Sequence, residues 1–554
     1  MKLINRDNIN SFKFIKIETL YFLILVFSML WLKKINYLFY NTIDSPDFEN
    51  YFVYFEHFFT NVLTNKEHGF LYYYMQAINF EVFYSQYENF NFYLHKSIQE
   101  VNFYIYLFGV IGYFLLFKLL KFKNSSIFLG LIFLNFFPPS ISMRLVFKPE
   151  ILTFSLFPWI IYLLEQFKSK KEFQYIWLSI PFLIGAITTK GNALVLVSIY
   201  LLLIYHKILY SLFKNKKIMI LTTFLIFFTC INLENIKDNG KNILDIQSGS
   251  SIEEQYDFKA PLNIIYKIDF FKLFSSPIKH NHASSFIGIT LLETTGDYFD
   301  LYWDNDASIF FKNRKNLVLF EQSYTIKAPK IDFQNQKIII YQQNLTDVYL
   351  NESIGLVISI FLFYLLFKSL SFDINLRKFY YSIFLGMLLL LIHSMLGIPK
   401  NNFDPLVGDT FKPLYYSFFF LFSFTLLITN LIEKREMKPI TIFIYCFIII
   451  YLLGFPKIYN YDIQSKLAPK IESSVTCEIE KNIFLKESPE TLVDCSIKDL
   501  GEKQKNDLKL TSPKPFNLLL LLLILLNSLL ITFKFDTSLN FSYLLKLKSI
   551  KSKK

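Results

Sequence analysis

The chain has 554 residues, of which 53% are hydrophobic and 19% aromatic, and its mean hydropathy is +0.34. Soluble domains rarely combine this length with so much apolar content, so the composition excludes an ordinary soluble enzyme. The net charge of +12 comes from basic residues in short clusters between apolar runs, and no signature of RNA or DNA binding accompanies it. We therefore expect membrane lipids, and no nucleic acid, among the partners.

Twelve apolar segments approach the length needed to cross a bilayer, which is roughly 20 mostly apolar residues. Basic residues precede the first segment and no small-residue cleavage site follows it, so we expect a signal anchor. The predicted fold class is an all-α polytopic membrane protein of about 12 transmembrane helices, with juxtamembrane helices and a mixed α/β extracytoplasmic loop region. The predicted spans are 17–36, 102–121, 125–142, 149–166, 174–189, 191–206, 217–233, 353–370, 378–397, 412–432, 438–455 and 515–533.

Short loops rich in Lys and Arg are expected on the cytoplasmic side. Such loops, among them KFKN, KSKK and EKREMK, alternate along the chain and fall on the same side as the basic N-terminus and the tail KLKSIKSKK. Lys33 and Lys34, at the outer end of the first span, are an exception. We predict that both termini are cytoplasmic and that the protein is a multi-pass protein of the plasma membrane, the inner membrane in a bacterium.

This topology divides the chain into transmembrane modules and long outer loops. The predicted divisions are an N-terminal transmembrane module 1–233 that includes the first outer loop 41–101, an outer loop 234–352, helices in 353–456, an outer loop 457–514, and a last helix with a basic tail in 515–554. Cys477 and Cys495 share the last outer loop, and whether they form a disulfide stays open.

Acidic residues open the first outer loop, in the stretch IDSPDFENY. Ser45 can cap a helix that begins there, and Asp47 and Glu49 would sit in its first turn, where the helix dipole favours acids. Aromatic residues follow at spacings of three and four, which predicts an amphipathic helix on the membrane surface. The acids can be caps only, or one can act as a general base at the lipid–water boundary. Asp44 is the better candidate because it precedes the cap and no helical role accounts for it.

Basic residues stand in two short connections between apolar segments. Arg144 and Lys148 lie in SMRLVFKPE, and Lys190 lies in TTKGN between two undersized spans. A base inside or at the edge of a membrane needs a partner or an anion, and a phosphate would serve. The alternatives are that Arg144 and Lys148 extend to the surface and that Lys190 belongs to a plain tight turn.

A run of acids and aromatics, TTGDYFDLYWDND, lies in the outer loop 234–352 and contains Asp297, Tyr298 and Asp300. Such a mixture suits a sugar, because rings stack on its apolar face and carboxylates accept its hydroxyls. A divalent cation is also possible, since hard cations favour oxygen ligands, although no spacing matches a known metal loop. His68 and Lys412 are weaker candidates, because a lone His in an aromatic setting is often structural and Lys412 can simply end its span.

The whole layout resembles the GT-C superfamily of polytopic glycosyltransferases, and within it the bacterial lipid-A aminoarabinose transferases and protein O-mannosyltransferases. IDSPDFENY occupies the place of the family's acidic motif in the first outer loop. HGFLYYYM resembles a following stretch of the family but lacks its two prolines, and TTGDYFDLYWDND and GDTFKPLYYSFFF resemble later elements. These motifs are short and degenerate, so the resemblance rests on their arrangement.

The resemblance implies a sugar donor on a polyprenyl phosphate, a lipid, glycan or protein acceptor on the outer face, and inversion at the anomeric carbon. It implies Asp44 or Asp47 as the catalytic carboxylate. The predicted substrate-binding residues are Glu49, His68, Arg144, Lys148, Lys190, Asp297, Tyr298, Asp300 and Lys412. Two other functions remain open, namely a transporter or flippase of a lipid-linked saccharide, and an enzyme like an O-antigen polymerase or ligase that would use basic loop residues.

Overall fold

The computed structural model describes most of the apolar segments and part of the connections between them. The described residues are 17–39, 48–60, 69–87, 90–214, 218–239, 268–275, 277, 282, 285–295, 325–332, 337–396, 417–434, 462–463, 509–511 and 513–532.

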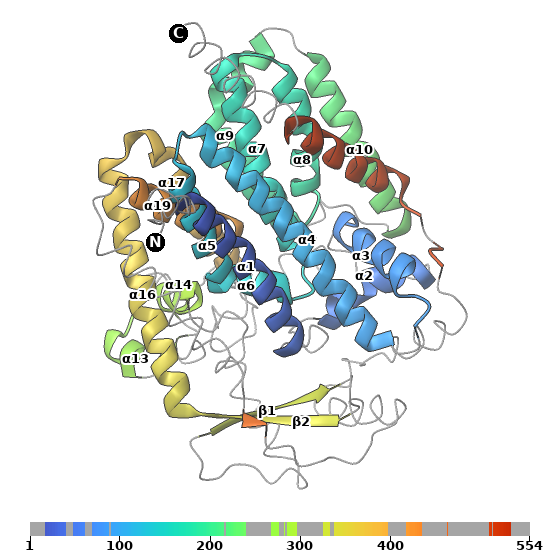
Figure 1. Cartoon of the computed structure of the whole chain (residues 1–554). Helices are drawn as coiled ribbons and strands as arrows, with labels where there is room; N and C mark the ends of the chain where they lie inside the picture. The colour runs from blue at the N-terminus through green and yellow to red at the C-terminus, as the bar shows by residue number, and fades with distance from the viewer. Residues whose placement is uncertain are drawn as a thin grey trace, which may run out of the picture.

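The described chain is mostly helical, and a helix occupies each predicted apolar segment that it includes (Figure 1). The predicted segment 438–455 lies outside the described residues. The helices at these segments are α1 (Ile17–Phe39), α4 (Phe90–Leu119), α5 (Asn124–Phe136), α6 (Pro138–Leu145), α7 (Glu150–Lys170), α8 (Gln174–Ile187), α9 (Gly191–Lys214), α10 (Ile218–Asn239), α16 (Leu345–Phe372), α17 (Ile374–Leu396), α19 (Ser417–Glu433) and the C-terminal helix Pro515–Thr532.

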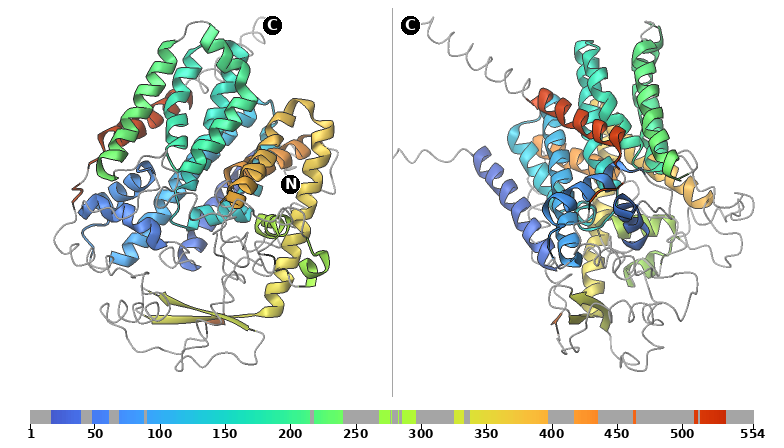
Figure 2. Two further views of the ribbon diagram at one scale, coloured as in Figure 1. Left: turned by 180° about the vertical axis from the view of Figure 1, so that it is seen from behind. Right: turned by 90° about the vertical axis from the view of Figure 1, so that its right-hand side faces the viewer.

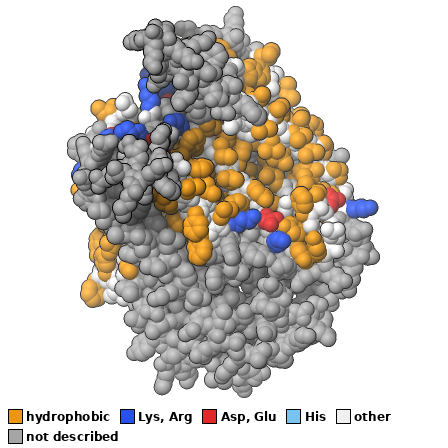
Figure 3. Space-filling model, viewed as in Figure 1, with side chains coloured by type: hydrophobic (Ala, Val, Ile, Leu, Met, Phe, Trp, Pro, Cys, Tyr) orange, Lys and Arg blue, Asp and Glu red, His pale blue; other side chains and the backbone are white. Residues whose placement is uncertain are grey.

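Within the described residues, three helices are long and apolar enough to cross a membrane, namely Tyr93–Leu119, Glu352–Ser371 and Pro515–Thr532. The pair α5 and α6 would make a fourth span, bent by 69°. Hydrophobic side chains form a broad surface over the described helices, interrupted by few charged ones (Figure 3). Leu202 of α9 and Leu522 and Leu526 of the C-terminal helix are each more than half exposed. The described chain is therefore a membrane-type helical protein with three to four candidate spans.

Helices α4 and α7 form the centre of the bundle and run parallel to each other. The Ser155 hydroxyl donates to the carbonyl oxygen of Ile105, and one helical turn further the Trp159 indole N–H donates to that of Phe108 at 3.0 Å. The close approach depends on Gly112, where a Cβ would lie 2.7 Å from the Trp159 ring. Small residues let helix backbones approach in this way inside membranes.

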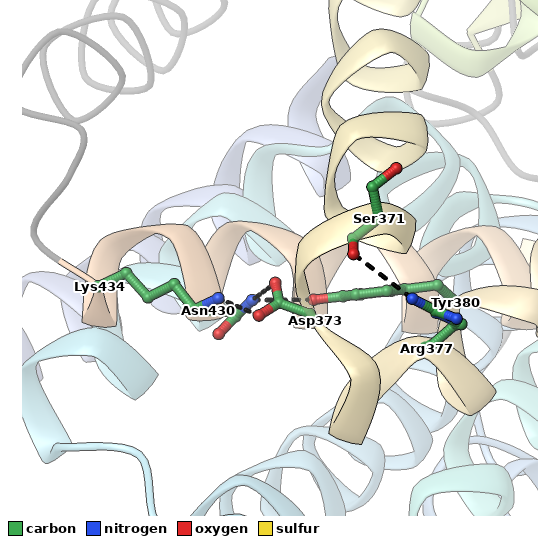
Figure 4. Close-up of polar contacts among 6 residues, drawn as sticks. All are labelled: Ser371, Asp373, Arg377, Tyr380, Asn430 and Lys434. Carbon is green, nitrogen blue, oxygen red and sulfur yellow. Dashed lines mark hydrogen bonds and ion pairs between the residues drawn. The ribbon is translucent and has the colours of Figure 1, made fainter.

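One end of the bundle is held by ion pairs between chain segments far apart in the sequence. Lys123, after α4, pairs with Glu433 at the end of α19 at 3.2 Å. Asp373, between α16 and α17, accepts from Lys434 and from Asn430, as Figure 4 shows. These residues lie in or beside the basic connections that the sequence places on the cytoplasmic side.

The C-terminal helix Pro515–Thr532 lies across α8 and α10 (Figures 1 and 2). The Asn527 amide donates to the carbonyl oxygen of Leu178 in α8 at 3.2 Å. Near the other end of this helix, Glu234 of α10 accepts from the backbone N–H groups of Phe516 and Asn517, each at 3.0 Å. The helix Pro515–Thr532 therefore packs against the first half of the chain.

The helices α2 (Phe48–Thr60) and α3 (Leu71–Phe83) cover the opposite end of the bundle from the ion pairs. The sequence predicts a helix here, with Pro46 at its first position, and the described helix begins two residues later, at Phe48. However, Tyr54 and Phe58 are buried as completely as the predicted stripe residue Phe55. The backbone N–H of Thr511 also donates to the carbonyl oxygen of Phe58 at 2.8 Å. The expectation that α2 lies on the membrane surface is therefore wrong: it is packed inside the protein.

A small sheet lies beyond the same end, below the bundle in Figure 1. Strand β1 (Thr325–Asp332) pairs antiparallel with β2 (Lys337–Asn344), which runs directly into α16. Strand β3 (Asp462–Ile463) pairs with the other edge of β2, at Tyr341 and Gln342. The sheet thus joins the segments predicted as the outer loops 234–352 and 457–514. The short helices α13 (Phe270–Ser275) and α14 (Phe286–Thr295) belong to the first of these segments.

Candidate functional site

Two of the predicted basic residues converge on one aromatic ring. The Lys148 and Lys190 ammonium groups each lie 5.7 Å from the centroid of the Tyr51 ring. Lys190 also donates to the Tyr51 hydroxyl at 3.4 Å. An ammonium group near a ring face is attracted by the ring's quadrupole, more strongly where water is excluded. Tyr51 is 4% exposed and Lys148 3%, so the contacts are shielded from solvent.

An acid that the sequence analysis missed completes the cluster. Glu150 Oε1 accepts from Lys190 Nζ at 2.9 Å, and the two side chains are 4% and 14% exposed. Its other oxygen, Oε2, is buried and has no hydrogen-bond partner within the described part of the chain. We refer to Tyr51, Lys148, Glu150 and Lys190 as the Tyr51 cluster.

Local sequence explains how each member reaches this place. Glu150 is the first residue of α7, where the helix dipole favours an acid, and Lys148 precedes it by two residues. Lys190 lies at the break between α8 and α9. There the hydroxyls of Thr188 and Thr189 donate back to the carbonyl oxygens of Ile184 and Gly185 at 2.7 Å and help to end α8.

The break between α8 and α9 is also joined to the start of α3. The backbone N–H of Gly69 donates to the carbonyl oxygen of Thr189 at 3.1 Å. The motifs HGFLYYYM and TTKGN, which the sequence analysis selected separately, therefore meet beside the Tyr51 cluster.

Buried tyrosines surround the cluster on the side of α3. The ring of Tyr73 stacks on that of Tyr54 at 4.7 Å and on that of Tyr51 at 6.4 Å. Burial, and then the neighbouring phenols and Glu150, raises the pKa of Tyr73 well above its ordinary value. Tyr72 donates to the side-chain oxygen of Asn102 in α4 at 2.8 Å. Tyr72 and Tyr73 stay neutral, so the cluster's charges lie in an aromatic, low-dielectric surrounding.

Arg144, also a predicted phosphate ligand, has a different environment. It donates through Nη2 to the carbonyl oxygen of Asn135 at 2.6 Å and through Nε to that of Ser140 at 3.1 Å. Its guanidinium carbon lies 4.6 Å from the centroid of the Tyr106 ring. These contacts hold the turn from α5 into α6. The described interactions therefore support a structural role for Arg144 and do not bring its guanidinium group to the Tyr51 cluster.

The other predicted site residues cannot be placed. Glu49 lies in α2, but its side chain is not described. Asp44, Asp47, His68, Asp297, Tyr298, Asp300 and Lys412 lie outside the described residues, as do Cys477 and Cys495. Among the residues that are described, no group of three or more His, Cys, Asp or Glu could hold a metal ion.

No protein-family model matches this chain, and no curated protein matches it.

Proposed function

We propose that the protein is an integral-membrane glycosyltransferase that moves a sugar from a polyprenyl-phosphate carrier to a lipid, glycan or protein acceptor at the extracytoplasmic face. The observation that supports this best is the convergence of Lys148 and Lys190 on Tyr51. Tyr51 lies in the first turn of α2, and Asp47 is the residue immediately before that helix. The candidate catalytic carboxylate therefore lies four residues before the ring that both ammonium groups approach.

The proposed topology has twelve spans and cytoplasmic termini, and three to four of these spans are candidate spans within the described residues. The ion pair Lys123–Glu433 lies at one end of the bundle and the Tyr51 cluster at the other. Basic connections belong on the cytoplasmic side, so the cluster would face the outer leaflet. In this proposal the sheet β1–β3 is part of the extracytoplasmic region.

The proposed reaction is a displacement at the anomeric carbon of the sugar. An acceptor hydroxyl attacks that carbon, the new glycosidic C–O bond forms, and the bond between the anomeric carbon and the phosphate oxygen breaks. Asp44, or failing it Asp47, takes the acceptor proton. The electron pair of the broken bond leaves with the carrier phosphate, and Lys148 and Lys190 stabilise the charge that develops there. A single displacement of this kind inverts the anomeric carbon.

A gene deletion in the host organism tests this proposal. Envelope glycans and glycolipids of the deletion strain would be compared by mass spectrometry with strains that express wild type, Asp44→Asn or the double variant Lys148→Met/Lys190→Met at equal levels. We expect one sugar mass to disappear on deletion, to return with wild type, and to stay absent with the double variant. With Asp44→Asn it should also stay absent, unless Asp47 is the base.

Two results would contradict the proposal. If intact lipid-linked saccharide accumulates on the inner leaflet of the deletion strain, the protein is a transporter of that lipid. If the double variant restores the sugar fully, the Tyr51 cluster does not bind the carrier phosphate.

A further inference from the structure

Glu150 has a carboxylate where the proposed phosphate site would be expected to need only positive charge. It pairs with Lys190 through Oε1 at 2.9 Å, yet Oε2 is buried without a hydrogen-bond partner within the described residues. A buried carboxylate that is only half satisfied is costly, because its second oxygen loses its hydration and gains nothing. The ion pair accounts for Oε1 and for the charge, since a glutamine would leave the Lys190 ammonium without its counter-charge. The buried, unpaired oxygen Oε2 is therefore what requires an explanation.

The position at the start of α7 does not provide it. A helix dipole favours an acid in the first turn, but the benefit is present for exposed acids and does not require burial. Glu165, near the other end of the same helix, shows an acid used for pairing: its Oε1 accepts from both Lys378 and the Tyr205 hydroxyl. The Oε1 of Glu150 accepts from Lys190 alone among the described residues, and its side chain is more deeply buried, at 4% exposed against 13% for Glu165.

We infer that Glu150 is a specificity-determining residue that selects carrier phosphates by their charge. This inference rests on the proposed function. Lys190 would bind the carrier phosphate while Glu150, in contact with the same ammonium group, repels it. The repulsion grows with each negative charge on the ligand. A sugar on a monophosphate carries one such charge, because its phosphate is a diester, and a sugar on a diphosphate carries more than one. Repulsive elements of this kind are a common means of specificity. Glu150 thus favours a sugar on a monophosphate and disfavours a sugar on a diphosphate.

The effect should be large because the surroundings are poor in water. Unit charges a few ångströms apart interact by several kcal/mol at the effective dielectric constant of a protein surface, and buried aromatic rings surround this cluster. We therefore expect removal of the Glu150 charge to raise the affinity for a diphosphate relative to a monophosphate diester by about tenfold or more.

Three ligands with one prenyl tail test the inference. Methyl farnesyl phosphate, farnesyl phosphate and farnesyl diphosphate carry about one, two and three negative charges at neutral pH. Their affinities would be measured by ligand-induced thermal stabilisation of the full chain in lipid nanodiscs. The variants are Glu150→Gln, the charge-retaining Glu150→Asp, and Glu165→Gln as the matched control at the other end of α7. Glu150→Ser is a second neutral variant in case Glu150→Gln does not fold.

We expect the dependence of affinity on ligand charge to change in Glu150→Gln, with the largest gain in affinity for the diphosphate. Glu150→Asp and Glu165→Gln should keep the wild-type dependence. If Glu150→Gln shifts all ligands equally, Glu150 only holds Lys190 and the inference is overturned, while the phosphate site stands. If Lys148→Met and Lys190→Met leave the binding of every ligand unchanged, the site of the proposed function fails, and the inference fails with it.

Discussion

Gly69 packs so closely against Thr188 that a Cβ at position 69 would lie 1.8 Å from the Thr188 carbonyl oxygen. The contact involves the backbone on both sides, so no side chain can move to relieve it. It fixes the start of α3 against the break between α8 and α9, and that break carries Lys190. The glycine of HGFLYYYM is therefore a packing requirement of the proposed site.

Gly69→Ala should separate α3 from this break and displace Lys190 from Tyr51. We expect a lower melting temperature and a loss of farnesyl phosphate binding, measured on purified protein in nanodiscs. Gly288→Ala is the control, because its Cβ would meet side-chain atoms and no backbone, the nearest being the Ser285 hydroxyl at 3.0 Å. Normal binding by Gly69→Ala would show that the contact between α3 and the α8–α9 break does not position the site.

Replacement of Lys190 by Met should destabilise the protein more than replacement of the whole pair. Lys190→Met leaves the Glu150 carboxylate buried without its cation, and breaking a buried pair in this way costs about 3–5 kcal/mol. The double variant Glu150→Gln/Lys190→Met removes the stranded charge and should recover part of the loss. The measurement is the melting temperature of all variants by size-exclusion chromatography after heating.

The matched control for this comparison is Lys123→Met. Lys123 pairs with Glu433, but its side chain is 59% exposed, and exposed ion pairs contribute little. We expect its melting temperature to stay close to that of wild type. A double variant no more stable than Lys190→Met would mean that Glu150 finds another partner when Lys190 is absent.

Two substitutions of Tyr51 separate the contribution of its hydroxyl to ligand binding from that of its ring. Tyr51→Phe removes the acceptor for Lys190 but keeps the ring that both ammonium groups approach. We expect a loss of a few-fold in farnesyl phosphate affinity for Tyr51→Phe and a much larger loss for Tyr51→Ala, because cation–π contacts are worth about 0.5–2 kcal/mol each when desolvated. Equal affinities of the two variants would exclude the ring as the element that positions the lysines.

The sequence was sufficient to locate the helices of the described apolar segments, but not to predict which of their faces are buried. Apolar runs such as 102–121 coincide with a helix because a buried or lipid-facing helix needs only length and hydrophobicity. Ser45 and Pro46 predicted a helix start, and α2 begins two residues after Pro46, at Phe48. Its burial did not follow from the sequence, because Tyr51, Tyr54 and Phe58 lie off the predicted stripe and are covered by segments distant in the chain, among them α3.

The sequence predicted only part of the candidate site, because it does not show which side chains meet once the chain is folded. Lys148 and Lys190 were recognisable because a cation between apolar segments needs a partner. Glu150 was not, since an acid after Lys-Pro looks like an ordinary helix start and its partner lies 40 residues away in the chain. Arg144 had the same sequence signal as Lys148, but the carbonyl groups that it binds are visible only once α5 and α6 are folded.

The ion pair at the other end of the bundle should make stability depend on acid pH. The pKa of Glu433 lies below its ordinary value of 4.5: partial burial raises it, but the backbone N–H of Lys123, the Ser126 hydroxyl and the Lys123 charge together lower it more. Because the folded protein binds this proton less readily than the unfolded chain, the stabilisation is present above about pH 4.5 and is lost as the pH falls through the folded pKa.

We therefore expect Glu433→Gln to melt slightly below wild type at pH 7 and at the same temperature as wild type well below pH 4.5. Differential scanning fluorimetry across this range checks the sign. A difference that grows towards acid pH would mean that the protonated form of Glu433 is the one that the fold stabilises.

The proposed sidedness can be tested at two exposed positions on opposite ends of the bundle. Gln86 lies in the turn between α3 and α4, within the predicted outer loop 41–101, and Ser169 lies near the end of α7, close to the basic connections. In a background without the four native cysteines, Gln86→Cys should react with a membrane-impermeant maleimide in intact spheroplasts, and Ser169→Cys only after lysis. The reverse pattern would place the Tyr51 cluster in the cytoplasm and exclude transfer at the outer face. Labelling of both positions from one side would show that α4 and α7 do not cross the membrane.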